Sequence, residues 1–167
     1  MAYEQLLVNM FVVEPMAAWT SNRLRRLSLS PKRYFVDPAG PATALGLDTS
    51  AVLPDGDLLG RLLDTFVAAQ LRVECASAES RPRLYHLREE HGRREVDVPA
   101  EIGGRDMLAF EVKAAAAPVA TRPGIWRGCV TASATTSWGD HVPYGPALLE
   151  LDERVTAAPI AALWGQA

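Results

Sequence analysis

The stretch REVDVPAEIGGRDMLAFEVKA, residues 94–114, constrains the fold more than any other part of the chain, because it has the pattern of two strands joined by a tight turn. Apolar and polar residues alternate on both sides of the turn, as in strands with one buried face. Gly103 and Gly104 supply the positive φ angles that a hairpin reversal uses. The sequence therefore predicts an antiparallel hairpin.

Charged residues lie within both predicted strands. Alternate side chains point to opposite faces, so Glu95 and Asp97 are expected on one face of the first strand, and Glu111 and Lys113 on one face of the second. These charges are either a functional site or the solvated face of an amphipathic hairpin, and the pattern alone favours neither.

The remaining pattern predicts an α/β fold in which a mixed central sheet is flanked by helices. The clearest helix covers 57–76, where apolar residues recur at helical spacing. Shorter helices are predicted over 3–13 and 41–45, strands over 33–37 and 84–89, and a loop over 49–57. No period of 2 or 3.6 is sustained over 119–138, and strand-like patterning resumes after Gly139.

Composition excludes several classes of protein. The 167 residues carry a formal net charge of −3, which disfavours a strongly basic nucleic-acid binder, although local basic patches remain compatible with it. The two cysteines, Cys75 and Cys129, indicate neither a disulfide framework nor a zinc site. There is no signal-peptide pattern and no apolar run of the roughly 20 residues that a membrane span needs, so we expect a cytoplasmic protein without a membrane partner.

Several motifs occur in an order that resembles a known family. SPKRYFVDPAG, GRLLDTFVAAQL, LYHLREEHGRREVDVPAE, LAFEVKA and AAPIAALW are similar to the uncharacterised C-terminal domain of bacterial and archaeal AAA-type ATP-binding proteins. That domain is considered similar to the PD-(D/E)XK restriction-endonuclease-like fold. The resemblance covers most of the chain outside residues 119–138.

The resemblance implies a set of site residues. Asp97 matches the acidic residue of the first hairpin strand, Glu111 and Lys113 match the (D/E)-x-K pair, and Asp64 stands where the family usually has Glu. In active members of the wider superfamily such carboxylates hold Mg²⁺, and the lysine acts on the attacking water. The implied reaction is Mg²⁺-dependent phosphodiester hydrolysis, with DNA as the implied partner. Glu95 is expected to be structural.

The resemblance also implies a domain organisation. Residues 1–33 match a remnant of a winged-helix-like linker segment, and residues 34–167 match the nuclease-like domain. The basic run from Arg23 to Arg33 either contacts phosphates, as its place after that segment implies, or is a solvated surface.

Family members carry an ATPase module before this domain, but the chain has no G-x-x-x-x-G-K-[ST] loop. We therefore expect no ATP site in this chain, and an AAA-type ATPase chain as a partner. The stretch 119–138 becomes an amphipathic helix when G+C-rich codons are read in another frame, so a frameshift there is a hypothesis. The alternatives to an enzyme are a non-catalytic interaction domain and a truncated gene remnant.

Overall fold

The structure is a computed structural model that describes residues 2–88, 95–104, 106–113, 132–137, 149–152, 155–158, 160 and 163. The helices in this part of the chain are α1 (Ala2–Asn9), α2 (Arg23–Arg26), α3 (Ala39–Ala44), α4 (Thr49–Val52) and α5 (Gly56–Ser77). None of the described helices is both long enough and apolar enough to cross a membrane.

The strands form one large sheet and two small ones. A β1–β2 hairpin joins Val13–Met16 to Lys32–Phe35, and a short β4–β5 pair joins Leu87–Arg88 to Glu95–Val96. The large sheet has the order β3-β6-β7-β8-β10-β9, and its strands are β3 (Arg83–Leu84), β6 (Val98–Ile102), β7 (Asp106–Lys113), β8 (Ala132–Ser137), β9 (Leu149–Asp152) and β10 (Val155–Ala158). It is mixed, because β7 runs parallel to β8 and antiparallel to β6.

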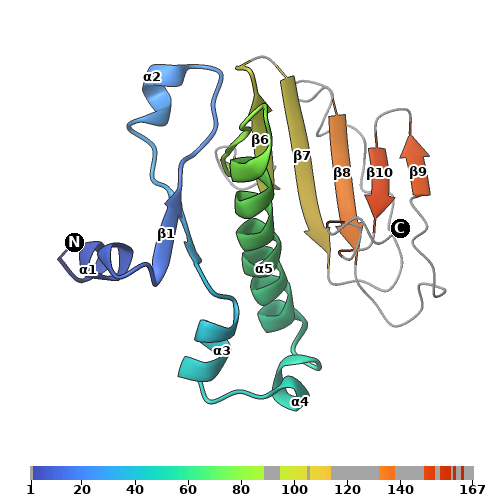
Figure 1. Cartoon of the computed structure of the whole chain (residues 1–167). Helices are drawn as coiled ribbons and strands as arrows, with labels where there is room; N and C mark the ends of the chain where they lie inside the picture. The colour runs from blue at the N-terminus through green and yellow to red at the C-terminus, as the bar shows by residue number, and fades with distance from the viewer. Residues whose placement is uncertain are drawn as a thin grey trace.

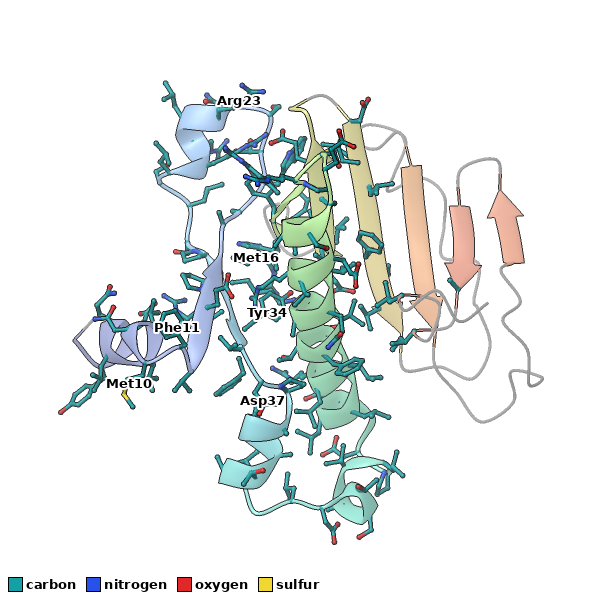
Figure 2. The ribbon with its side chains drawn as sticks, in the orientation of Figure 1. Met10, Phe11, Met16, Arg23, Tyr34 and Asp37 are labelled. Carbon is teal, nitrogen blue, oxygen red and sulfur yellow. The ribbon has the colours of Figure 1, made fainter. Side chains whose placement is uncertain are left out.

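Helix α5 lies between the β1–β2 hairpin and the large sheet (Figure 1). Its buried face is Val67, Ala68 and Leu71, which pack with Met16 and Tyr34 of the hairpin and with Val98 and Val112 of the sheet. Figure 2 shows Met16 and Tyr34 pointing from the hairpin toward this helix. The core therefore forms where α5, the β1–β2 hairpin and the large sheet meet.

Local sequence explains where α5 begins. Asp55 is the N-cap, and its Oδ1 accepts a hydrogen bond from the Leu58 amide at 3.0 Å. Asp57 follows in the first turn, where a carboxylate interacts favourably with the helix dipole. The predicted helix over 57–76 is confirmed within a residue of each observed end.

The predicted antiparallel hairpin and its glycine turn are also confirmed. Ile102 pairs with Asp106, and Gly103 and Gly104 have φ angles of 58° and 75°. Its first strand, however, is not continuous: it bends at Asp97, with β5 on one side and β6 on the other. The prediction of one continuous first strand that carries both Glu95 and Asp97 is therefore wrong.

Three other expectations need correction. The helix predicted over 3–13 ends at Asn9, because Phe11 adopts a φ of 56° and the chain then enters β1. The loop predicted over 49–57 contains α4, which Asp48 caps through the Ala51 amide. The strand predicted over 84–89 is divided into β3 and β4, which belong to different sheets.

The α/β class and the mixed sheet are confirmed, whereas the division at residue 33 and the winged-helix origin of residues 1–33 stay predictions. Strand β2 crosses that boundary. Most of the stretch 119–138, which the frameshift hypothesis concerns, lies outside the described residues. The described part of that stretch is β8, and β9 and β10 follow Gly139 as the strand-like pattern predicted.

A surface around α1 exposes large apolar side chains. Tyr3, Met10 and Phe11 are 84, 62 and 81% exposed, and Leu6 is about half exposed. Figure 2 shows Met10 and Phe11 at the end of α1, away from α5 and the large sheet.

Candidate functional site

Asp97 stands at the bend between β5 and β6, and its polar groups face neighbouring elements. Its Oδ2 accepts a hydrogen bond from the Val112 amide of β7 at 2.9 Å. Its backbone carbonyl accepts one from the Tyr34 hydroxyl at 3.3 Å. The carboxylate thus ties the bend to β7 at the point where regular strand pairing begins.

Lys32 of β2 brings together acidic side chains from two other elements. Its Nζ lies 3.7 Å from Asp64 Oδ2 on α5 and 3.8 Å from Glu95 Oε1 on β5. The same ammonium is 5.0 Å from the centre of the Tyr34 ring. We call Lys32, Tyr34, Asp64, Glu95 and Asp97 the lysine cluster.

The electrostatics of the lysine cluster keep Lys32 charged. Burial pushes the pKa of Lys32 down and is the largest single influence, but Tyr34, Asp64 and Asp97 together raise that pKa above its usual value. Burial also raises the pKa of the Tyr34 hydroxyl, against the opposing effect of Lys32. At neutral pH the cluster therefore contains an ammonium and a neutral phenol beside its carboxylates.

Glu111 and Lys113 occupy β7. Asp97 directly precedes Val98, which pairs with Phe110, and Glu111 directly follows Phe110. Asp97 and Glu111 thus occupy adjacent positions of neighbouring chain segments, and Glu111 Oε2 is buried. Lys113 is the last residue of β7, and its side chain lies outside what the structure describes.

The fit of this site to Mg²⁺ can be judged from its donors and their arrangement. Carboxylate oxygens are the ligands that Mg²⁺ prefers. Within the described residues, however, no group of three or more His, Cys, Asp or Glu side chains is arranged to hold a metal ion. Lys32 compensates the charge of Asp64 and Glu95 instead. The described arrangement therefore does not fit a shared ion, and Mg²⁺ binding by Asp97, Glu111 and Asp64 stays a prediction.

Sequence reasoning missed the roles of Lys32 and Tyr34. Lys32 was interpreted as part of a basic run, although burial alternates along β2, with Lys32 and Tyr34 more buried than Arg33 and Phe35. That alternation indicates a shared inward face, and a lysine on an inward face needs acidic partners. Glu95 pairs with both Lys32 and Arg88, which supports the structural role expected for it.

A second charged constellation joins the N-terminal segment to the large sheet. Arg26 donates through Nη1 to Glu101 Oε2 at 2.8 Å, through Nη2 to Glu101 Oε1 at 3.0 Å, and through Nε to the Thr20 carbonyl at 2.6 Å. Its guanidinium also lies 5.3 Å from the Trp19 ring centre and 4.9 Å from that of Tyr85. We call this group the arginine clamp.

The arginine clamp shields its charges from solvent. The side chains of Arg26 and Glu101 are only 9 and 11% exposed. The hydrogen bonds from Arg26 hold the pKa of Glu101 below its usual value, against the opposing effect of burial. Arg26 is therefore used for packing and pairing, although the sequence placed it in a run that could contact phosphates.

The rest of the basic run has mixed roles. Arg33 pairs with Glu4. Arg23 is exposed, and its Nη2 donates to the Gly104 carbonyl at 3.2 Å. The basic run from Arg23 to Arg33, expected either to contact phosphates or to be a solvated surface, is thus not one continuous basic face, because Arg26 and Lys32 have internal acidic partners.

Comparison with known proteins gives one family match. A family described as a domain of unknown function, DUF4143, matches residues 59–128. This region contains most of α5, the β6–β7 hairpin, and all four predicted site residues, Asp64, Asp97, Glu111 and Lys113. Neither the curated proteins nor the solved structures provide a match.

Proposed function

We propose that this chain is a binding domain without metal-dependent chemistry of its own, built on a nuclease-like α/β sheet. The lysine cluster is the observation that carries the proposal. Asp64 lies beside the charged Lys32, and Asp97 Oδ2 accepts the Val112 amide. Two of the three carboxylates predicted to hold Mg²⁺ therefore have structural partners.

Charge balance supports this use of the carboxylates. A half-buried lysine within 4 Å of two carboxylates gains Coulomb energy that offsets part of its lost hydration. A divalent cation would have to approach the same acidic groups against the repulsion of that ammonium. The lysine cluster thus holds the hairpin, α5 and β5 together, which is a structural task.

The resemblance to domains of AAA-type ATP-binding proteins supports an ATPase chain as a protein partner, and DNA as a second one. Both are proposals. The family match concerns a domain of unknown function and names no partner.

Calorimetric titration with Mg²⁺ and Mn²⁺ tests the proposed function. The wild-type chain, Asp97→Asn, Glu111→Gln and the control Asp57→Asn are compared; Asp57 is an exposed carboxylate on α5. We expect no saturable metal binding that depends on Asp97 or Glu111. Saturable binding that is lost in Asp97→Asn and Glu111→Gln but kept in Asp57→Asn would overturn the proposal.

Mg²⁺-dependent phosphodiester hydrolysis is the second candidate. The adjacent positions of Asp97 and Glu111, and the place of Lys113 two residues further on β7, favour it. Cleavage of DNA that requires Mg²⁺ and disappears in Lys113→Ala would support this candidate over the first. Cleavage that persists in Lys113→Ala would remove Lys113 from the mechanism.

A further inference from the structure

A cavity of about 570 Å³ opens at the end of the molecule where α2, the segment after α5 and the β6–β7 turn meet. Figure 2 shows Arg23 at this end. The charged side chains on its wall are Arg23, Arg26, Arg81, Arg83 and Glu101. We call it the arginine groove.

The arginine groove carries an excess of positive charge. Arg26 and Glu101 neutralise each other within the arginine clamp. Arg23, Arg81 and Arg83 are exposed, and no carboxylate in the described part of the chain forms an ion pair with any of them. Three cations therefore converge on one hollow in a chain whose net charge is −3.

Arg81 occupies a backbone position that suits glycine better than arginine. Its φ is 43°, in the left-handed region. Pro82 follows Arg81 directly and further restricts the backbone angles that Arg81 can adopt. Holding a non-glycine residue there costs roughly 1 kcal/mol or more. Strain of this kind collects at binding sites, where the side chain is needed although the backbone opposes it.

An apolar cavity adjoins the arginine groove. It has a volume of about 840 Å³ and shares Arg81, Arg83 and Tyr85 with the groove. Pro15, Met16, Val73, Ala76 and Leu84 supply most of its apolar wall. The ion pair between Arg72 and Glu14, at 3.1 Å, also lines it. A ligand that spans both cavities would need anionic groups beside apolar ones.

A single nucleic-acid strand has this alternation, since each phosphate is followed by a base. We propose that the arginine groove binds the phosphates of a single nucleic-acid strand through Arg23, Arg81 and Arg83, and that a base enters the adjoining apolar cavity. The proposal rests on the proposed function, because it names the partner of a binding domain. Arginine suits this task, because its planar guanidinium can donate two hydrogen bonds to one phosphate.

The groove is separate from the lysine cluster. Five residues of extended chain, β6, lie between Asp97 and Gly103, so the six residue steps that separate these two positions span roughly 20 Å. Substitutions in the groove therefore leave the predicted metal ligands untouched. The strand would bind by charge and by apolar contact of a base, and binding requires no divalent cation.

Fluorescence anisotropy with a short labelled oligodeoxynucleotide, in low salt with EDTA, tests the proposal. The double variant Arg81→Gln/Arg83→Gln is compared with the charge-matched control Arg33→Gln/Arg61→Gln, whose arginines lie outside the groove. We expect roughly tenfold weaker binding in the groove variant and a salt slope that is smaller by about 1.4, for two phosphate contacts. The control should stay within about twofold of wild type, as expected for charges that contact no phosphate.

Arg81→Gly separates binding from folding. Glycine relieves the positive φ, so this variant is expected to unfold at the wild-type temperature or above, yet to bind the oligonucleotide more weakly. Absence of wild-type binding, or equal losses in the groove and control variants, would overturn the proposal. So would inorganic phosphate or duplex DNA competing as well as the single strand, because the site would then recognise phosphate alone or a duplex.

The outcomes of the two tests are independent. A failure to bind the oligonucleotide in EDTA contradicts the arginine groove and leaves the calorimetric result on Asp97 and Glu111 unchanged. Saturable metal binding at those carboxylates contradicts the proposed function and leaves an effect of Arg81→Gly on strand binding intact.

Discussion

At the scale of single residues, Lys32 is the side chain whose environment departs most from its sequence context. It belongs to a basic run, yet its ammonium lies within 4 Å of Asp64 and Glu95 and against the Tyr34 ring. Lys32 contributes to stability by compensating the charges of the two carboxylates, and its removal leaves those carboxylates without their cation.

Substitution of Lys32 by methionine tests this contribution. We expect Lys32→Met to lower the free energy of unfolding by about 1–2 kcal/mol. The loss is not larger because the ion pairs of Lys32 with Asp64 and Glu95 are half-buried, so solvent screens part of their Coulomb attraction. Chemical denaturation of the wild type and the variant measures the change. Arg61→Met breaks an exposed pair with Asp57 and should cost less than about 0.5 kcal/mol. Equal effects of the two substitutions would contradict the role assigned to Lys32.

Substitution of Phe11 is expected to raise the free energy of unfolding, in contrast to that of Lys32. It has a φ of 56° just after α1 and is 81% exposed, so its ring gains little from packing while its backbone is strained. We expect Phe11→Gly to raise the free energy of unfolding by about 0.5–1 kcal/mol, as glycine favours the left-handed position after a helix. Thermal unfolding measures this. A loss of stability would mean that the Phe11 ring has a packing role that its exposure conceals.

At the scale of elements, the junction between β5 and β6 depends on one carboxylate. Asp97 Oδ2 accepts the Val112 amide, and the chain bends so that β5 pairs with β4 while β6 pairs with β7. Two substitutions distinguish whether the junction needs Asp97 as a hydrogen-bond acceptor or as a negative charge.

Asp97→Asn keeps an acceptor for the Val112 amide, whereas Asp97→Ala removes it. We expect the alanine variant to lose about 1–3 kcal/mol of stability and the asparagine variant clearly less, since an unpaired buried amide is costly. Hydrogen exchange at the Val112 amide should accelerate in the alanine variant. If asparagine is as damaging as alanine, the charge of Asp97 matters more than its hydrogen bond.

At the scale of the whole molecule, the arginine clamp fastens the N-terminal segment to the sheet. Glu101 has a lowered pKa in the folded state, so the stability it contributes is present above its usual value of 4.5 and is lost as the pH falls through the depressed pKa. The pH dependence of unfolding below pH 4.5 therefore reports on this pair.

Glu101→Gln provides the test. It should destabilise the chain at neutral pH by roughly 1–2 kcal/mol, as expected when the charged acceptor of a part-buried pair is removed. The difference from wild type should shrink in acid, where Glu101 is protonated in both folded and unfolded chains. Denaturation curves at neutral and acidic pH measure this. A difference that is constant with pH would contradict the assignment.

Features that are fixed by residues close together in the chain could be predicted from the sequence, and features that depend on residues far apart could not. The β6–β7 turn was readable because Gly103 and Gly104 specify it locally, and α5 because its cap and apolar stripe lie within one segment. The bend at Asp97 could not be predicted, because it depends on hydrogen bonds with Tyr34 and Val112, which are distant in sequence.

The candidate site shows the same limit. The sequence points to Asp64, Asp97, Glu111 and Lys113, but Lys32, which compensates Asp64 and Glu95, comes from a basic run that was expected either to contact phosphates or to be a solvated surface. The strand predicted over 33–37 leaves Lys32 out, whereas β2 begins at that residue, and only the packing of β2 against α5 shows that Lys32 meets Asp64.

The arginine clamp also sets an order of events during synthesis. The hydrogen-bonded partners Arg26 and Glu101 are 75 residues apart, so the ribosome must add that length before the clamp can close. At about 5–20 residues per second this takes roughly 4–15 seconds. For nearly all of that interval Met16, which is buried in the folded chain, lacks Val98 of the sheet, with which it packs in the core. The nascent chain is then most exposed to aggregation and to chaperones, and a codon change that slows translation between these residues would prolong that exposure.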